Sequence, residues 1–201
     1  MSAVTRTVVW GVGAEAATSR DPALAEKLRS ASTLGVMLTM AALAFVSHAF
    51  NMFRYPTYLG DEGIYLQQAW AVLRQNRLSP YTYWYDHAPG GWLFLAWWLA
   101  VLQQRYDLFG MALNTGRLLM LVLHVASAIL LYRIALRLSW SNRVAVVATG
   151  AFSLSPLALY YQRMVLLDNI MVFWLLLALY LLVFDDDRLW PSVGSALAFA
   201  M

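Results

Sequence analysis

The chain has 201 residues, of which 61% are hydrophobic and 12% are charged, and its formal net charge is +3. Soluble domains carry about 25% charged residues, and a fold of this size cannot bury so much apolar surface in its core. The composition therefore excludes an ordinary soluble domain and predicts an integral membrane protein. The absence of cysteine excludes disulfides, thiolate metal sites and cysteine nucleophiles. No basic run predicts a nucleic-acid partner, so the basic residues are interpreted as markers of membrane topology.

Residues 1–31 carry several charged side chains ahead of the first apolar segment and do not resemble a secretory signal. We interpret them as a cytoplasmic tail that includes a short helix over 21–30. The segment 30–53 has 24 residues without a charge, which exceeds the roughly 20 residues needed to cross a bilayer. Three further apolar segments predict spans, and a last one begins another helix; they are 114–132, 144–162, 166–184 and 189–201.

The segment 54–113 is polar and aromatic, and a loop of this length is uncommon unless it has a function. Within it, 88–104 is short, free of charge and contains three Trp residues. Such a segment either spans the bilayer or lies along its interface, where Trp is favoured. The 14 Lys and Arg divide 8 inside and 6 outside in the interfacial arrangement, and 7 and 7 if the segment spans. The inward excess of basic residues favours the interfacial interpretation, which makes 54–113 one outer loop.

The sequence Gly60-Asp61-Glu62 opens a helical pattern within this loop. Asp61 falls at the N-cap or in the first turn, where free N–H groups and the helix dipole favour a carboxylate. Asp61 is therefore either a helix cap or an acid at the membrane interface that serves as a base for an acceptor hydroxyl. Glu62 lies about 100° further around the helix. The apolar stripe of this helix predicts that it lies on the membrane surface; it consists of Leu66, Ala69, Trp70 and Leu73.

Arg163 and Asp168 lie in the turn between two predicted spans, with no other charge for 19 residues before and 16 residues after them. Ionisable groups beside hydrocarbon are costly and usually face a cavity or a charged partner. The two residues either form a structural ion pair that closes the turn or belong to a functional site. In the predicted topology, this turn lies on the same outer side as Asp61.

Other polar residues are weaker candidates. His87 is either a polar contact point or part of a turn before a helix. Arg117, near the outer end of a predicted span, either holds a lipid phosphate or extends to the headgroups. His48 is interpreted as a buried polar residue bonded to a neighbouring helix. The acidic run 185–187 has the residue type of a metal cluster, but it lies beside Arg188 at the inner end of a span, and we interpret it as solvated.

Four motifs follow one another along the chain: GDEGIY (60–65), HAPGGW (87–92), NTGRLL (114–119) and RMVLLDNIMVFW (163–174). In this order they resemble the N-terminal half of the GT-C-fold glycosyltransferases. The resemblance is to the protein O-mannosyltransferase family and to its bacterial relatives that transfer aminoarabinose to lipid A. It covers about residues 33 to 201, and its last motif is the most specific.

The resemblance implies an all-α, multi-pass integral membrane fold, with an incomplete GT-C domain over 32–201. It implies an inverting transfer of a hexosyl, pentosyl or mannosyl group from a polyprenyl-phosphate carrier to an acceptor hydroxyl outside the plasma membrane. The catalytic positions are then Asp61, which is the base, and its neighbour Glu62. The donor-side or second acidic positions that the resemblance suggests are Asp168, Arg163, Arg117 and His87.

The resemblance also implies partners. These are membrane lipids, the polyprenyl-phosphate sugar as substrate and an acceptor that the sequence does not identify. A divalent metal is compatible with such a site, but nothing in the sequence indicates one. Family members continue through further spans and a later outer loop, so we expect this chain to be an N-terminal part that is inactive without a C-terminal half. The alternative is a non-enzymatic multi-pass membrane protein, such as a transporter fragment or an assembly subunit, with Arg163 and Asp168 as a structural pair.

Overall fold

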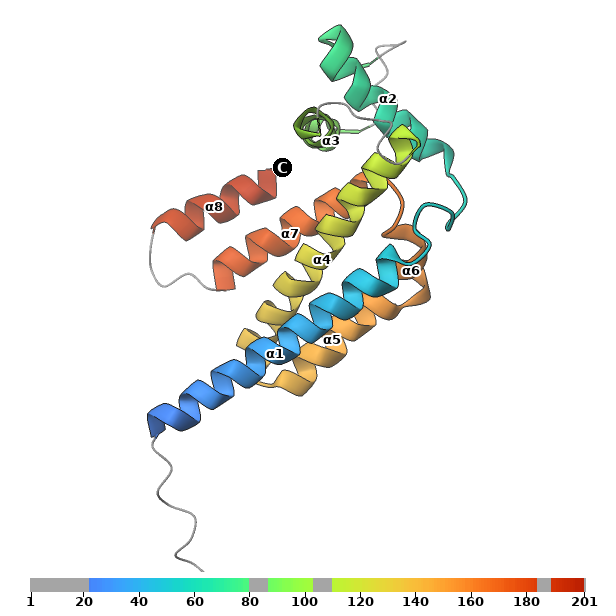
Figure 1. Ribbon diagram of the computed structural model, residues 1–201. Helices are drawn as coiled ribbons and strands as arrows, with labels where there is room; N and C mark the ends of the chain where they lie inside the picture. Colours follow the sequence, from blue (N-terminus) through green and yellow to red (C-terminus); the bar gives the residue numbers. More distant parts are fainter. Residues whose placement is uncertain (1–21, 80–86, 103–109, 184–188, 201) are drawn as a thin grey trace, which may run out of the picture. The chain divides into compact units, whose positions relative to one another are not determined.

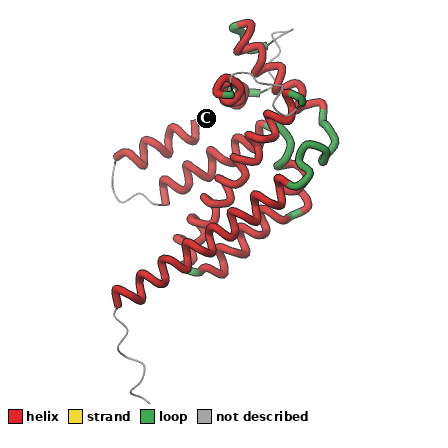
Figure 2. Tube along the Cα trace, in the orientation of Figure 1, coloured by secondary structure: helices red, strands yellow, loops and turns green. Residues whose placement is uncertain are grey.

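The computed structural model describes residues 22–79, 87–102, 110–183 and 189–200, and all regular structure in these ranges is helical (Figures 1 and 2). This confirms the all-α class. The chain divides into two units, 1–35 and 36–201, and the contacts described below lie within the second. The predictions for residues 1–21 and for the acidic run 185–187 lie outside the described residues. The helices are α1 (Pro22–Ala49), α2 (Gly60–Gln75), α3 (Gly90–Val101), α4 (Ala112–Ser139), α5 (Asn142–Leu154), α6 (Pro156–Tyr161), α7 (Leu167–Val183) and α8 (Leu189–Ala200).

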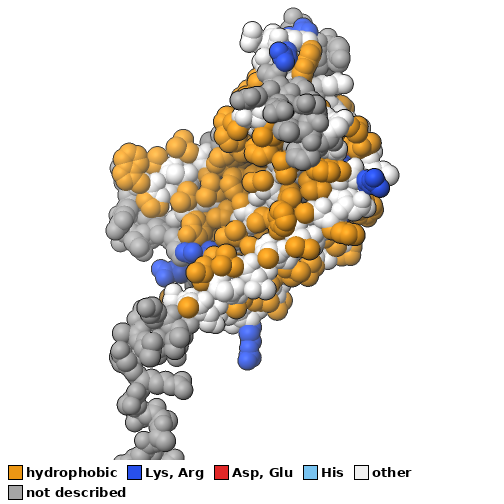
Figure 3. Space-filling model, in the orientation of Figure 1, with side chains coloured by type: hydrophobic (Ala, Val, Ile, Leu, Met, Phe, Trp, Pro, Cys, Tyr) orange, Lys and Arg blue, Asp and Glu red, His pale blue; other side chains and the backbone are white. Residues whose placement is uncertain are grey.

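Helix α4 is the central element of the second unit, because it packs against both α5 and α7, and α8 packs on α7 (Figure 1). The second half of α1 joins this group through Met40, which packs with the buried Tyr132 of α4 and Ala145 of α5. Hydrophobic side chains cover much of the face shown in Figure 3, and the Lys and Arg side chains visible there lie toward the ends of the helices. This distribution suits helices that are surrounded by an apolar medium.

Two helices among the described residues are long and apolar enough to cross a membrane, Ser30–Ala49 within α1 and the whole of α4. They correspond to the spans predicted over 30–53 and 114–132. Helix α7 coincides with the span predicted over 166–184 but has only 17 residues. The prediction that all these segments cross the bilayer in a GT-C arrangement stays a prediction.

The span predicted over 144–162 is not one continuous helix, because α5 ends at Leu154 and α6 starts at Pro156. Proline donates no N–H hydrogen bond and disfavours a helical conformation of the residue before it. Ser155 accordingly has an extended backbone with ψ 145°. Its hydroxyl oxygen caps α6 by accepting a hydrogen bond from the N–H of Ala158 at 3.2 Å.

Helices α2 and α3 pack on each other and contact α4. Figure 1 shows α3 end-on, whereas α4 is seen lengthwise across the picture, so α3 lies crosswise to α4. Its 12 residues give about 18 Å of helix, which is too short for a hydrocarbon core of about 30 Å. This geometry supports the interfacial interpretation of 88–104. A hydrophobic core that includes Trp92, Leu99, Met120 and Val165 joins α2, α3, α4 and the segment before α7.

Candidate functional site

The centre of the candidate site is a buried ion pair between Glu62 in the first turn of α2 and Arg117 in the first turns of α4. Both side chains have 0% exposure, and Arg117 Nη2 lies 2.8 Å from Glu62 Oε1. Arg117 Nε donates a second hydrogen bond to Glu62 Oε2 at 3.0 Å. The pair is therefore bidentate, which is the strongest arrangement of a guanidinium and a carboxylate.

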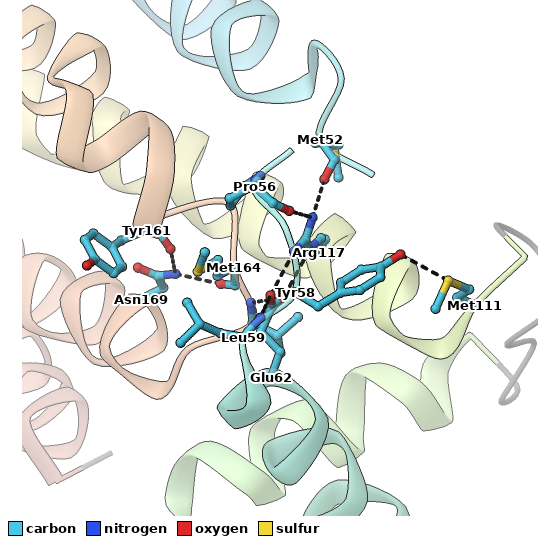
Figure 4. A network of polar contacts seen from close by, with 11 residues as sticks. Met52, Pro56, Tyr58, Leu59, Glu62, Met111, Arg117, Tyr161, Met164 and Asn169 are labelled. Atoms are coloured by element: carbon cyan, nitrogen blue, oxygen red, sulfur yellow. Dashed lines mark hydrogen bonds and ion pairs between the residues drawn. The ribbon is translucent and has the colours of Figure 1, made fainter. Parts of the chain in front are cut away.

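The remaining donors of Arg117 bind the chain that links α1 to α2. Its Nη1 group donates to the carbonyl oxygens of Met52 at 2.9 Å and Pro56 at 3.0 Å (Figure 4). The Tyr58 ring lies over the guanidinium at 5.2 Å. Four of the five N–H groups of a guanidinium are thus engaged inside the protein. This enclosed arrangement favours a structural role for Arg117 over the phosphate contact that the resemblance suggested.

The carboxylate of Glu62 also accepts hydrogen bonds from two backbone N–H groups. Val165, in the turn before α7, donates to Oε2 at 3.1 Å, and Leu59, at the start of α2, donates to Oε1 at 3.4 Å. Each carboxylate oxygen therefore accepts two hydrogen bonds. The pair with its four backbone partners, which we call the Glu62–Arg117 hub, brings together the motifs GDEGIY, NTGRLL and RMVLLDNIMVFW.

Two motif glycines allow the close approach of these segments. A Cβ atom on Gly116 of α4 would lie 2.8 Å from Val165 Cγ2 and 3.3 Å from Leu66 Cδ2. A Cβ atom on Gly91 of α3 would lie 2.7 Å from Leu167 Cδ2. Real Cβ atoms almost never approach other atoms below 3.0 Å. Gly116 of NTGRLL and Gly91 of HAPGGW therefore pack closely against the segment that leads into α7.

Asp61 is exposed in the first turn of α2, whereas its neighbour Glu62 is completely enclosed. An open groove of about 700 Å³ is lined by Gly60 and Gly63, which flank the acidic pair in the sequence. The rest of its lining is mostly apolar and comprises Tyr58, Leu59, Leu66, Gln67, Trp70, Leu99, Met111, Ala112 and Leu113.

Arg163 and Asp168 do not form an ion pair within the described part of the chain. Arg163 is buried, donates from Nη2 to the carbonyl of Ser47, and lies 5.7 Å from the Tyr55 ring. Burial lowers the pKa of the Arg163 guanidinium, and repulsion from Arg117 acts in the same direction, although a guanidinium stays charged in proteins. The interpretation of Arg163 and Asp168 as a pair that closes the turn is therefore wrong.

Asp168 is exposed in the first turn of α7, three residues after Val165. Because Val165 is bonded to Glu62, both exposed acids lie within three residues of the same contact. His87 is also exposed, and its ring meets the edge of the Tyr65 ring of α2 at 5.6 Å. The structure thus brings the motif segments together at the end of α4 that carries Arg117. The catalytic and donor-side roles of their side chains stay predictions.

Residues 82–188 match the family model described as dolichyl-phosphate-mannose-protein mannosyltransferase. The matched residues are just over half of the 201-residue chain, so the chain belongs to this family of membrane proteins. It is a glycosyltransferase of the mannosyltransferase type, which confirms the family resemblance and disfavours the non-enzymatic alternative. No curated protein and no solved structure matches the chain.

The matched segment includes His87, Arg117, Arg163 and Asp168, whereas Asp61 and Glu62 precede it. The Glu62–Arg117 hub connects the matched segment with the residues that precede it, since Glu62 binds Arg117 and the N–H of Val165. In the described residues, no group of three or more His, Cys, Asp or Glu side chains is placed to hold a metal ion. The sequence offered no direct signal for the pairing of Glu62 with Arg117, because 54 residues separate the two.

Proposed function

We propose that this chain carries the acceptor-activating site of an inverting glycosyltransferase. The enzyme transfers a sugar, mannose by family, from a polyprenyl phosphate to an acceptor hydroxyl outside the membrane. Asp61 accepts the proton of the acceptor hydroxyl as that oxygen forms its bond to the anomeric carbon. The bond between the anomeric carbon and the phosphate oxygen breaks at the same time, and the polyprenyl phosphate leaves with the electron pair. Attack from the face opposite the leaving group inverts the anomeric carbon.

The observation that carries this proposal is the contrast between Asp61 and Glu62. Glu62 is enclosed and held by Arg117 and two backbone N–H groups, so it is not available to a substrate. Asp61 is the exposed member of the pair, and the hub fixes the first turn of α2 that carries it. A base held by rigid surroundings loses little conformational freedom when the acceptor binds. In this proposal Glu62 and Arg117 are positioning residues.

The groove lined by Gly60 and Gly63, which flank the acidic pair in the sequence, suits the apolar part of a lipid-linked substrate. Its volume of about 700 Å³ lies within the range of roughly 300–1,000 Å³ typical of small-ligand sites. Its lining is mostly apolar, so a hydrocarbon chain gains free energy by leaving water there. We place the substrate in this groove with its polar, reacting end near the first turn of α2. Asp168, exposed at the start of α7, is the second acidic position of the site.

We further propose a multi-pass plasma-membrane topology in which this end of α4 faces outward. The tail 1–31 and the turn between α4 and α5, which Arg137 and Arg143 flank, then lie in the cytoplasm, in keeping with the positive-inside rule. The crosswise orientation and shortness of α3 support a location along the outer interface. Both exposed acids then reach acceptors on the outer side.

The test compares Asp61→Asn with Asp168→Asn in the protein that carries this chain. Each change removes one exposed carboxylate from a first helical turn, so the two variants are matched. Loss of a general base lowers turnover about 10²–10⁴-fold, or about 3–5 kcal/mol of transition-state stabilisation. We expect this loss for Asp61→Asn, with unfolding behaviour unchanged. Near-normal transfer by Asp61→Asn, with the loss found in Asp168→Asn instead, would show that the base is assigned to the wrong residue.

A further inference from the structure

Tyr58, in the chain that links α1 to α2, touches both the Glu62–Arg117 hub and the apolar groove. The Cζ atom of Arg117 lies 5.2 Å from the centroid of its ring, and Tyr58 also lines the groove. A cation holds an aromatic ring against itself in this way, and Arg117 is itself fixed by Glu62 and by the carbonyls of Met52 and Pro56. The hub therefore places the Tyr58 ring, although 55% of the residue is exposed.

The hydroxyl group of Tyr58 has a weak hydrogen-bond partner. It donates to the Sδ atom of Met111 at 3.2 Å, which is its one hydrogen bond in the described part of the chain. Figure 4 shows the ring directed from Arg117 toward Met111, so that the hydroxyl points away from the hub. A thioether sulfur is only a weak acceptor. The hydroxyl therefore loses little if it turns from the sulfur to a stronger acceptor in the groove.

The groove follows one face of α2. Its lining includes Gly60, Gly63, Gln67 and Trp70, whose spacings of three and four residues place them on the same side of a helix. Gly60 and Trp70 are about 15 Å apart along the helix axis at a rise of 1.5 Å per residue. A Cβ atom on Gly60 or Gly63 would meet nothing within 4 Å, so the groove is open beside the first turn of α2. Tyr58 precedes Gly60 by two residues and therefore belongs to this end of the groove.

An open, mostly apolar groove with a hydroxyl donor at one end suits a hydrocarbon chain that carries a phosphate. In a polyprenyl-phosphate sugar the phosphate is attached directly to the chain, so it is the first polar group beyond the hydrocarbon. Hydrogen bonds to an ionised acceptor are about twice as strong as those between neutral groups. We propose that Tyr58 is a phosphate-binding residue, whose O–H turns from the Met111 sulfur to a phosphate oxygen when the chain lies along α2.

This inference rests on the proposed function for the class of substrate, and it adds the residue that recognises the phosphate and the direction of the chain. In apolar ligand sites, a few placed polar groups fix the orientation of the ligand. With the phosphate at Tyr58, the hydrocarbon runs toward Trp70. The sugar then lies on the other side of the phosphate, toward the first turn of α2 that carries Asp61.

The test is ligand binding to the protein that carries this chain, purified in detergent. Tyr58→Phe removes the hydroxyl and retains the ring over Arg117. We expect the Kd for tritium-labelled farnesyl phosphate to rise about 10–100-fold, which corresponds to one hydrogen bond to a charged group. The Kd for labelled farnesol, which has the same chain without the phosphate, should rise about threefold or less. An unchanged Kd for farnesyl phosphate, or an equal rise for both ligands, would overturn the proposal.

Met111→Leu is the matched control. It removes the sulfur that accepts from Tyr58 and keeps an apolar side chain of similar volume in the wall of the groove. If Tyr58 binds the phosphate, this variant should bind farnesyl phosphate like the unaltered protein, and neither variant should change Tm. If the bond between Tyr58 and Met111 only shapes the groove, both variants should lose the same affinity. That result would overturn the proposal.

The binding measurement also separates this inference from the proposed base. The expected effect of Tyr58→Phe, found together with normal transfer by Asp61→Asn, would refute the role of Asp61 and support that of Tyr58. Loss of transfer in Asp61→Asn without any effect of Tyr58→Phe on binding would do the reverse. Absence of saturable farnesyl phosphate binding to the unaltered protein would overturn both the class of donor and the role of Tyr58.

Discussion

Replacing Glu62 by Gln should destabilise the protein strongly, although the two side chains have the same shape. Oε1 accepts from Arg117 Nη2 and from the N–H of Leu59, and Oε2 accepts from Arg117 Nε and from the N–H of Val165. In Gln one of these oxygens becomes an NH2 group, which donates. Either orientation of the amide therefore places a donor against two donors, and the Arg117 charge also loses its counter-charge.

The expected cost is about 3–5 kcal/mol, the usual penalty for removing one partner of a buried ion pair. For a chain of this length, that corresponds to a fall in Tm of roughly 6–20 °C. Arg117→Met should cost a similar amount, because it also leaves the carbonyls of Met52 and Pro56 without their donor. The assay is unfolding in detergent followed by the fluorescence of the nine Trp residues.

The double variant Glu62→Leu with Arg117→Met separates the contribution of the ion pair to stability from that of the backbone groups bonded to it. Replacing a whole buried ion pair with apolar side chains is often close to neutral. What remains is four backbone groups without their partners, the carbonyls of Met52 and Pro56 and the N–H groups of Leu59 and Val165. They cost about 1–3 kcal/mol each. We expect the double variant to be less destabilised than the sum of the two single variants. Additive effects, or single effects below about 1 kcal/mol, would refute a structural role for the hub.

Three further predictions follow from other contacts. Gly116→Ala should push Val165 away and lower stability by about 1–3 kcal/mol, measured by the same unfolding assay; an unchanged Tm would contradict the close approach. Ser155→Ala should cost about 1 kcal/mol through loss of the α6 cap, and no change would deny the cap its role. In intact cells, an impermeant thiol reagent should label a single cysteine placed at Asp168 and should not label one placed at Trp140. Labelling at Trp140 would overturn the topology.

The sequence predicted the helical elements well because their signals are local. Uninterrupted apolar segments predicted α1, α4 and α7, and the GDE sequence followed by an apolar stripe predicted α2. The failure at 144–162 also has a local cause. Hydrophobicity remained high across Ser155 and Pro156, so the apolar pattern masked the break that Pro156 introduces.

The site was harder to predict because its chemistry depends on pairing across the fold. The motifs indicated which segments matter, but the partners of the charged residues stayed open. Arg117 was expected either to hold a lipid phosphate or to extend to the headgroups, and Arg163 either to pair with Asp168 or to belong to a functional site. The structure pairs Arg117 with Glu62 and directs Arg163 to the carbonyl of Ser47. The sequence therefore identified the charged residues of the site, whereas helix packing decides which of them pair. That choice is invisible to a pattern along the chain.

The most direct test of the central claim is a transfer assay with defined donors. The protein that carries this chain is reconstituted in lipid vesicles and supplied with either polyprenyl-phosphate mannose or a nucleotide-linked mannose. We predict transfer from the polyprenyl-phosphate donor, with inversion at the anomeric carbon and a 10²–10⁴-fold loss in Asp61→Asn. Transfer from the nucleotide-linked donor alone, or retention of the anomeric configuration, would contradict the proposed function.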